Sequence, residues 1–328
     1  KLIFRSCYPS WTAIAKFVGI SKTITSIETS QPINDDFMKF AHSYISNKES
    51  ALNTLSFSNN DFGPDFIEGL KLILQPSKIV SLTIRNQLTK EGYQAIAPLI
   101  LDFEGFQSVK YFDVSGCKYV EPEFVLIQLT NLTTLKLNDC SIDISVLLED
   151  LSKNKHIPLT EIHCCDNFCS EKLDTSYVIS KKIKTIVADG VAWQNSSLSK
   201  FIYILSNAEN PMEINLSIRD AQMSVPEWHS LDEFLQSFLS NTIVSLDYSG
   251  NKIQSGFCTF MNNSPKLTKL TVNGCFSPTD NSIEIFSRYL SSNQNLEELY
   301  VIGTDTFYMG SSVNFLFKAL KTMHFLQL

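Results

Sequence analysis

The stretch LTTLKLNDCSI, from Leu132 to Ile142, contains the pattern that decides the fold. Apolar residues stand at its first, fourth, sixth and eleventh positions, and a cysteine stands at the ninth. Around Leu135 and Leu137 the apolar residues alternate with polar ones, which is the two-residue period of a short β-strand. The pattern therefore predicts a strand with one apolar and one polar side.

The same pattern recurs along the 328 residues of the chain. Good copies are LNTLSFSNNDF (52–62), VKYFDVSGCKY (109–119), LTEIHCCDNFC (159–169), IVSLDYSGNKI (243–253) and LTKLTVNGCFS (267–277). Weaker copies begin at residues 24, 79, 183, 213, 296 and 323, so that the steps run from 23 to 30 residues and average about 27. Self-similarity of this kind is the signature of leucine-rich repeats.

The length of the step predicts what connects one strand to the next. A step near 24 residues leaves room for an extended or short helical return, whereas about 27 to 30 residues admit a full α-helix. Five spacers show the three- and four-residue apolar intervals of helices: 36–47, 65–74, 145–154, 231–241 and 282–293. We therefore predict an α/β leucine-rich-repeat solenoid, or horseshoe, with a parallel concave sheet and convex helices.

Asparagine has two predicted roles in these repeats. The spacers run into Asn47, Asn154, Asn207, Asn241 and Asn293, which we expect to end helices in the left-handed backbone conformation. After the strands, an asparagine or cysteine is expected to turn inward and donate to the backbone of the bend. These inward residues are Asn60, Asn167, Asn251, Cys117, Cys140 and Cys275.

Two regions are predicted in the chain. Residues 1–23 do not match the repeat, and SWTAIAKFVGI (10–20) has the spacing of a helix that would cap the first repeat. Residues 24–328 form about eleven to twelve repeats. The chain starts at Lys1 and stops at Leu328 inside a predicted strand, so we expect a piece of a longer polypeptide with further repeats or a cap beyond it.

The segment EIHCCDNFC (161–169) could also be a metal site, because three cysteines and a histidine fall within seven residues. Alternation along a strand, however, separates Cys164 from His163 and Cys165, so four ligands do not converge. We therefore interpret the cysteines as substitutes for leucines, with Ile162, Cys164 and Cys169 directed inward. No cofactor or metal is predicted.

Composition and motifs exclude several function classes. Phosphate loops, zinc-protease helices and nucleophile elbows are absent from the sequence, and the five histidines are scattered, so we do not predict an enzyme. A net charge of −7 with 19% charged residues argues against nucleic acid as a partner. Apolar runs are too short for a membrane helix, and eight irregularly spaced cysteines favour reduced thiols in the cytoplasm.

Protein binding remains, and the concave surface of a repeat protein is the place to look for it. The variable strand positions there are polar, small and mixed in charge, which favours a transient partner. The candidate contacts are Arg85, Tyr111, Asp113, Lys136, His163, Cys165, Arg219, Asp247, Lys269 and Tyr300. An alternative function is regulation or targeting of a small GTPase, with Arg85 as an arginine finger.

The order of the segments MEINLSIRDAQMS (212–224), NTIVSLDYSGNKI (241–253), PKLTKLTVNGCF (265–276) and SIEIFSRYLSSNQNLEELYVIGTD (282–305) resembles the middle and later repeats of the CARMIL family. This resemblance implies a scaffold of the actin cytoskeleton at the cell cortex. It also implies a membrane-binding domain before the repeats, a dimerisation region after them, and a tail that binds actin capping protein. Capping protein or class I myosin would then be partners of the full-length protein, and no site residue carries over to this chain. A generic adaptor is a third possibility.

Overall fold

The computed structural model describes residues 1–4, 10–30, 34, 36–58, 64–85, 104–118, 120, 130–206, 213–276, 281–303 and 313–322. It forms two compact units. The N-terminal unit contains Lys1–Ile142 and Lys153–His163, and the C-terminal unit contains Asp143–Ser152 and Cys164–Leu328. The predicted repeat that begins at residue 323 and the inward Asn60 lie outside the described residues.

Parallel strands form the sheet of each unit, in the order of the sequence. In the N-terminal unit they are β1 (Leu2–Phe4), β2 (Ser26–Thr29), β3 (Thr54–Ser58), β4 (Ser81–Arg85), β5 (Tyr111–Asp113), β6 (Thr134–Lys136) and β7 (Glu161–His163). In the C-terminal unit they are β9 (Thr185–Val187), β11 (Ile214–Ser217), β12 (Ile243–Asp247), β13 (Lys269–Thr271) and β14 (Glu298–Tyr300). A strand therefore lies at every predicted repeat within the described residues, which confirms the leucine-rich-repeat fold class. β1 was not predicted, because it lies in the segment expected to be a helical cap.

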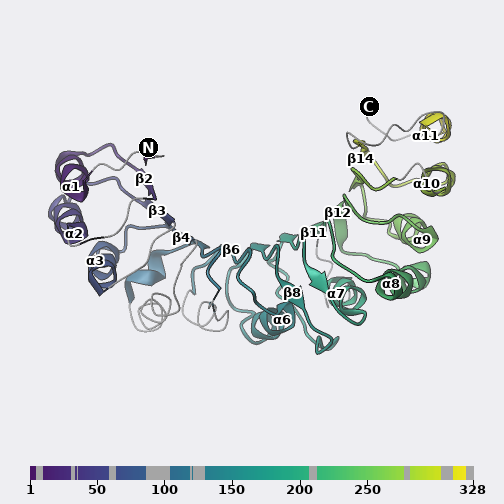
Figure 1. Ribbon diagram of the computed structural model, residues 1–328, viewed down its shortest axis with the longest axis horizontal. Coiled ribbons are helices and arrows are strands. Elements are labelled where there is room, and N and C mark those ends of the chain that lie inside the picture. Colours follow the sequence, from purple (N-terminus) through teal and green to yellow (C-terminus); the bar gives the residue numbers. More distant parts are fainter. Residues whose placement is uncertain are drawn as a thin grey trace. The chain divides into compact units, whose positions relative to one another are not determined.

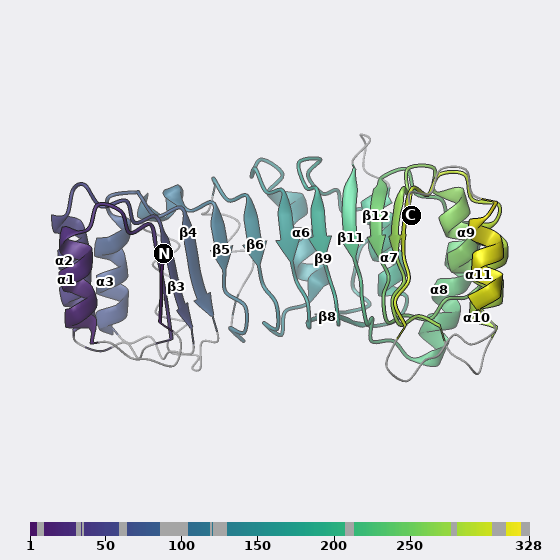
Figure 2. The same ribbon diagram turned by 90° about the horizontal axis from the view of Figure 1, so that it is seen from above.

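The helices of each unit lie on one side of its strands and leave the other side open (Figures 1 and 2). They are α1 (Trp11–Ile20), α2 (Phe37–Ser46), α3 (Pro64–Leu74) and the 3₁₀ helix η1 (Glu104–Ser108) in the N-terminal unit. The C-terminal unit has α7 (Ser197–Ser206), α8 (Val225–Ser237), α9 (Ser255–Asn263), α10 (Ser282–Leu290) and α11 (Val313–Leu320), and α6 (Ile144–Lys153) ends at the boundary. The five predicted helices are present. α8 begins earlier than predicted because Ser224 and Glu227 form a capping box.

The short steps of the repeat take two forms. Between β7 and β9, a step of 24 residues contains turns and the two-residue strand β8 (Phe168–Cys169), which pairs with β10 (Ala192–Trp193) in a second, small parallel sheet. The extended return predicted for such a step is confirmed there. Between β12 and β13, a step of the same length holds the nine-residue helix α9. Step length alone therefore does not decide the form of the return.

The asparagines at the helix ends do not adopt the left-handed conformation that the sequence predicted. Asn47 has φ −87°, and none of Asn154, Asn241 and Asn293 has a positive φ. Asn47 and Asn293 bond the preceding helix through their side chains instead. The Asn47 amide donates to the carbonyls of Val18 (2.8 Å) and Ser21 (2.7 Å) at the end of the preceding helix. Asn207 lies outside the described residues.

A left-handed position recurs in the turn after each of the strands β5, β6, β7, β9, β11, β12 and β13. These positions are Gly116, Asp139, Asp166, Gly190, Asp220, Gly250 and Gly274. Except at Asp139, the amide of each donates to a carbonyl in the turn of the next repeat, at 2.7 to 2.9 Å; for example, Gly250 donates to Asn273 at 2.8 Å. A Cβ at Gly250 would overlap the carboxylate of Asp220, so glycine is required there by space as well as by its φ of 73°.

The predicted inward hydrogen bonds after the strands are confirmed. The Asn251 amide donates to Ile218 O at 2.7 Å and accepts from Ala221 N at 2.8 Å, and Asn167 donates to Cys164 O at 3.0 Å. The cysteine thiols also donate to backbone carbonyls, over longer donor–acceptor distances. Cys117, Cys140 and Cys275 donate to Ile84 O, Val114 O and Tyr248 O, each at 3.3 Å. Asn251 and the three cysteines thus tie their turns to the preceding repeat, and Asn167 bonds the backbone of its own turn.

The apolar core lies between the strands and the helices. Near the beginning of the N-terminal unit it is aromatic: the rings of Trp11 and Phe37 are 4.9 Å apart, and those of Phe57 and Phe66 are 5.3 Å apart. Trp11 is fully buried, which fits the predicted role of α1 as a cover for the first repeat. In the described residues, none of the helices has the length and apolar character needed to cross a membrane.

Removal of an inward asparagine tests the turn ladder. Asn251→Ala leaves the buried Ile218 carbonyl and Ala221 amide without their partner, which should reduce the free energy of unfolding by about 2 to 4 kcal/mol. The measurement is urea unfolding followed by circular dichroism. The control is Asn241→Ala, at an exposed position just before this repeat, which should change stability by less than about 0.5 kcal/mol. Equal effects of the two substitutions would contradict the role of Asn251.

Candidate functional site

The open face of the sheet in the N-terminal unit carries two rows of polar side chains. Strand register aligns one row, and the next row lies two residues further along the strands. The first row is Ser81, Tyr111, Thr134 and Glu161, and the second is Thr83, Asp113, Lys136 and His163. Arg85 lies at the end of β4, beside these rows. Five of the ten predicted contacts thus lie on one face: Arg85, Tyr111, Asp113, Lys136 and His163.

Arg85 and Asp113 form an ion pair across neighbouring strands. Arg85 Nε donates to Asp113 Oδ2 at 2.8 Å, and Nη2 donates to the same oxygen. Tyr111 donates its hydroxyl to Oδ2 at 3.3 Å, and the amide of Ser115 donates to Oδ1 at 3.1 Å. The sequence placed Asp113 on the exposed face, but its side chain is 0% exposed, whereas that of Arg85 is 45% exposed. Asp113 therefore positions Arg85, and Arg85 is the group that faces solvent.

The ionisation of this cluster follows from its geometry. Burial alone would raise the pKa of Asp113, but the bonds from Arg85 and Ser115 outweigh burial and hold the pKa below its ordinary value. The hydrogen bond to Asp113 raises the pKa of Arg85. Burial, with the nearby Asp113 charge, raises the pKa of Tyr111 to about 12. At neutral pH the cluster is thus a fixed pair of opposite charges beside a neutral phenol.

Lys136 and Glu161 continue the face toward β7. The Lys136 ammonium lies 5.6 Å from the centre of the Tyr111 ring, within the range of a cation–π interaction. Glu161 Oε1 is 2.6 Å from His163 Nε2, and Oε2 accepts from Thr134 at 3.4 Å. The hydrogen bond with His163 lowers the pKa of Glu161. The Glu161 carboxylate is 38% exposed and is therefore accessible as a fixed negative charge.

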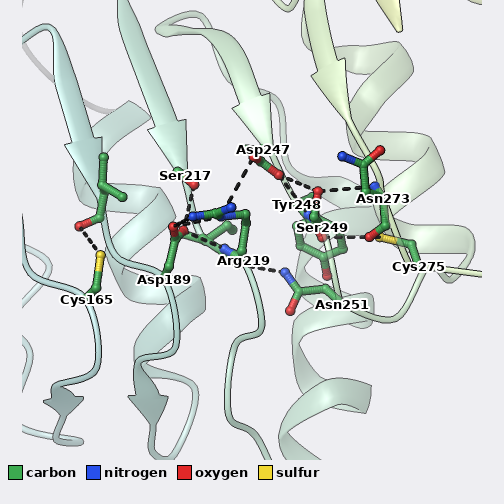
Figure 3. A network of polar contacts seen from close by, with 12 residues as sticks. Cys165, Asp189, Ser217, Arg219, Asp247, Tyr248, Ser249, Asn251, Asn273 and Cys275 are labelled. Carbon is green, nitrogen blue, oxygen red and sulfur yellow. Dashed lines mark hydrogen bonds and ion pairs between the residues drawn. The ribbon is translucent and has the colours of Figure 1, made fainter. Parts of the chain in front are cut away.

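In the C-terminal unit, Arg219 is the centre of a second polar network (Figure 3). Arg219 Nε and Nη2 lie 2.8 and 2.7 Å from Asp189 Oδ2, and Arg219 N donates to Asp189 Oδ1 at 2.9 Å. Ser217 donates to the same Oδ1 at 2.6 Å. The predicted contact Asp247 lies further away, at 3.9 Å from Arg219 Nε. The hydrogen bond to Asp189 raises the pKa of Arg219.

From Asp247 the network continues along the turns (Figure 3). Asp247 Oδ1 accepts from Ser249 Oγ at 2.6 Å and from Ser249 N at 3.1 Å. Ser249 Oγ accepts from Asn273 N at 3.1 Å, and Asn273 Oδ1 accepts from Ile302 N at 2.7 Å. These bonds fix the carboxylate of Asp247 and join three successive repeats.

Lys269 and Tyr300 meet at the last described strands. The Lys269 ammonium lies 5.1 Å from the centre of the Tyr300 ring and 2.8 Å from Glu298 Oε2. The Tyr300 hydroxyl donates to the same carboxylate oxygen at 3.0 Å. The bond to Glu298 raises the pKa of Lys269, and the bond from Lys269 lowers that of Glu298. All three side chains are about half exposed.

The cysteine-rich segment has the arrangement expected of a repeat. Ile162, Cys164 and Cys169 are buried, as predicted, and Cys165 is partly exposed on the open face, where its thiol lies 3.8 Å from Val187 O. Burial raises the pKa of Cys164 and of Cys165. Among the residues that the structure describes, His, Cys, Asp and Glu do not form groups of three that could hold a metal ion.

A cavity of about 650 Å³ lies at the turn side of the C-terminal unit, between the turns after β12 and β13 and the starts of α9 and α10. Its polar groups are largely used by the fold itself. Asp232 Oδ1 accepts from Gly256 N at 2.6 Å, and the Asn251 amide is bonded to two backbone groups. The cavity therefore offers fewer unused polar groups than the open sheet face.

Asp189 is the main residue that the ten predicted contacts lack. It follows β9 by two residues, as Asp247 lies at the end of β12, and it supplies both oxygens to the Arg219 network. An aspartate at the turn of one repeat, followed about 30 residues later by an arginine at the turn of the next, is the signal that could have identified it. Glu161 and Glu298 were also absent from the ten.

Comparisons with known proteins bear on the fold. Models of protein families do not match the chain, and curated proteins do not match it either. A chain of the yeast Rad7–Elc1 complex is 14% identical over 95% of this chain and 79% of its own, with a TM-score of 0.54. An internalin of Listeria monocytogenes (13% identity, 94% and 81% covered, TM-score 0.42) and the Drosophila Toll–Spätzle complex (14%, 99% and 46%, 0.44) are also similar. At 14% identity, the likeness to the Rad7–Elc1 chain shows the fold alone, and it agrees with the leucine-rich-repeat architecture.

The lowered pKa of Asp113 predicts an acid-sensitive contribution to stability. Its folded pKa lies below its unfolded value of about 3.9, so this contribution is complete above that pH and is lost as the pH falls through the folded pKa. Asp113→Asn should cost about 1.5 to 3 kcal/mol at pH 7, and the difference from the wild type should shrink below about pH 4.

Urea midpoints measured at pH 7, 5, 4 and 3 give this difference. Asp65→Asn, which changes an exposed carboxylate on α3, is the matched control and should have little effect at any of these pH values. A difference between Asp113→Asn and the wild type that stays constant from pH 7 to pH 3 would contradict the assignment.

Proposed function

We propose that this chain is a protein-binding module and that its partner contacts the open face of the sheet. The observation that carries the proposal is that half-exposed charged side chains on this face are already held by cross-strand bonds. Asp113 holds Arg85, Asp189 holds Arg219, and Glu298 holds Lys269. Because these side chains are ordered before binding, a partner does not have to pay for ordering them, and affinity benefits.

The chemistry of the face favours a protein over a nucleic acid. Arg85, Arg219 and Lys269 each lie within 4 Å of a carboxylate, so positive and negative charges alternate on this face and do not form the continuous basic surface that a phosphate backbone requires. Leucine-rich repeats are typical of protein-binding modules, although a fold hosts many functions and the residues must carry the argument. Tyr300, 45% exposed beside Lys269, is the best aromatic anchor on this face.

A finer proposal is that the module belongs to a CARMIL-like scaffold of the actin cytoskeleton in the cytoplasm, near the cell cortex. The order and spacing of the repeats support it, and the strands β11 to β14 lie at the repeats from which the resemblance was drawn. In such a scaffold, the capping protein would bind outside this chain. Class I myosin is then the probe for the sheet face itself.

The GTPase alternative is less well supported by the site. An arginine finger must reach the charge that develops on a transferred phosphate. Two nitrogens of Arg85 are already bonded to a buried carboxylate, and removing Arg85 from Asp113 would leave that charge unpaired. Arg85 is therefore better suited to a fixed surface contact than to insertion into another active site.

The test uses the full-length protein with purified class I myosin and purified capping protein. Wild-type protein should retain both, and Arg85→Ala with Arg219→Ala should weaken the binding of myosin at least tenfold while the binding of capping protein is unchanged. Arg288→Ala, which removes an ion-paired arginine from the helix α10, is the matched control. Lys269→Ala adds a variant at an exposed position where unfolding is not expected.

Failure to retain either protein would contradict the CARMIL-like assignment. Unchanged myosin binding by all the sheet-face variants would contradict the use of the open face. Acceleration of GTP hydrolysis by a small GTPase that disappears with Arg85→Ala would favour the alternative function.

A further inference from the structure

The same set of polar residues occurs in both units. In each, an arginine follows Ile in Thr/Ser-Ile-Arg, and Asp-x-Ser-Gly-x-Lys begins 28 residues later, at Asp113 and at Asp247. Asn-x-Cys and Glu-x-His/Tyr follow in the next two repeats. We call these sets the first module (Arg85, Asp113, Ser115, Asn138, Cys140, Glu161, His163) and the second module (Arg219, Asp247, Ser249, Asn273, Cys275, Glu298, Tyr300).

The contacts repeat along with the residues at the turns. The aspartate Oδ1 accepts from the serine amide at 3.1 Å in both modules. The serine hydroxyl accepts from the asparagine amide at 3.3 Å in the first and 3.1 Å in the second. The cysteine thiol donates to a backbone carbonyl at 3.3 Å in both. The backbone that supports the two modules is thus the same.

The exposed ends of the modules also correspond. In each, a glutamate bonds the ring residue two positions later: Glu161 with His163 at 2.6 Å, and Glu298 with Tyr300 at 3.0 Å. A group on the preceding strand reaches the same carboxylate, from Thr134 in the first and from Lys269 in the second. These glutamates are 38% and 45% exposed.

The arginines are held by carboxylates but remain half exposed. Nε and Nη2 of Arg85 bond Asp113, with Tyr111 also interacting with this guanidinium, and those of Arg219 bond Asp189. The side chains are 45% and 51% exposed. The modules differ here, since Asp189 rather than Asp247 is the close partner of Arg219. In both, however, a carboxylate of the preceding or following repeat fixes the guanidinium.

The turn explains the repeated serine, asparagine and cysteine, but it does not require the arginine or the glutamate. In each module the arginine and the glutamate are three strand-to-strand steps apart, from β4 to β7 in the first and from β11 to β14 in the second. At 4.8 Å per step, this separation is about 14 Å. An extended peptide covers this distance with about four residues. The two ends of each module are therefore a half-exposed arginine and a half-exposed glutamate.

We infer that each unit contains one copy of the same peptide-binding site, and that the chain binds two equivalents of one segment. The segment is extended, with an acidic side chain for the arginine and a basic side chain about four residues away for the glutamate. This inference rests on the proposed function and specifies its partner.

The experiment uses a display library of random 12-residue peptides selected on the whole chain. An enriched peptide is synthesised and titrated by isothermal calorimetry. We expect two peptides per chain and an enriched pair of opposite charges about four residues apart. Arg85→Ala or Glu161→Gln should leave one site, as should Arg219→Ala or Glu298→Gln, and Arg85→Ala with Arg219→Ala should lower affinity at both sites at least tenfold. Arg288→Ala should retain two sites.

The glutamate substitutions keep the test independent of folding, because these exposed side chains can change without leaving a buried charge. One peptide per chain, or a peptide whose two sites survive the paired arginine substitutions, would overturn the inference and leave the proposed function standing. The inference would also be overturned if the chain still bound two peptides after the acidic residue of the peptide was changed to lysine. If the library yields no binder, this inference fails, and the proposed function is still decided by the binding of class I myosin to the full-length protein.

Discussion

The hydrogen bonds between successive turns are the constraint on which the rest of the structure depends. A repeat of this kind cannot bury its apolar side alone, so it is stable only when stacked on its neighbours. The turns join them twice, through backbone amides such as that of Gly250 and through inward side chains such as Asn251. Strand register follows from these bonds, and register places the polar rows on the open face.

That dependence explains why the charged residues of the face are ordered. Asp113 lies where the strand enters the turn, so its Oδ1 accepts from Ser115 while its Oδ2 is directed at Arg85. Asp247 combines the same two roles, with Ser249 and, at longer range, Arg219. One carboxylate thus links the turn to the arginine on the open face. A substitution that moves the turn would therefore also move the arginine.

The sequence predicted the features that recur in every repeat, which are the strands and the inward turn residues. It did not predict the contacts that a single residue makes with a neighbouring repeat. Alternation and step length located the strands, and the inward roles of Asn251 and Cys140 followed from their position in the pattern. The burial of Asp113 was missed, because alternation gives the side of a strand but not the depth to which a neighbouring arginine covers it. The end of the helix at Asn47 was predicted correctly, but its backbone conformation was not, because its side-chain amide bonds the preceding helix, a contact that the pattern of one repeat does not reveal. Asp189 was missed for the same reason.

The contact between aspartates and glycines in successive turns determines which repeats could be lost from the chain while the remaining repeats still stack. The carboxylates of Asp166 and Asp220 lie over Gly190 and Gly250 of the next repeat, where a Cβ would not fit. Loss of the repeat with Gly250 would bring Gly274 under Asp220, and the stack could close again. Loss of the repeat with Gly190 would instead place the Cβ of Asp220 against the carboxylate of Asp166, and that side chain would have to move. The first of these two junctions would therefore rejoin more easily after the loss of a repeat than the second.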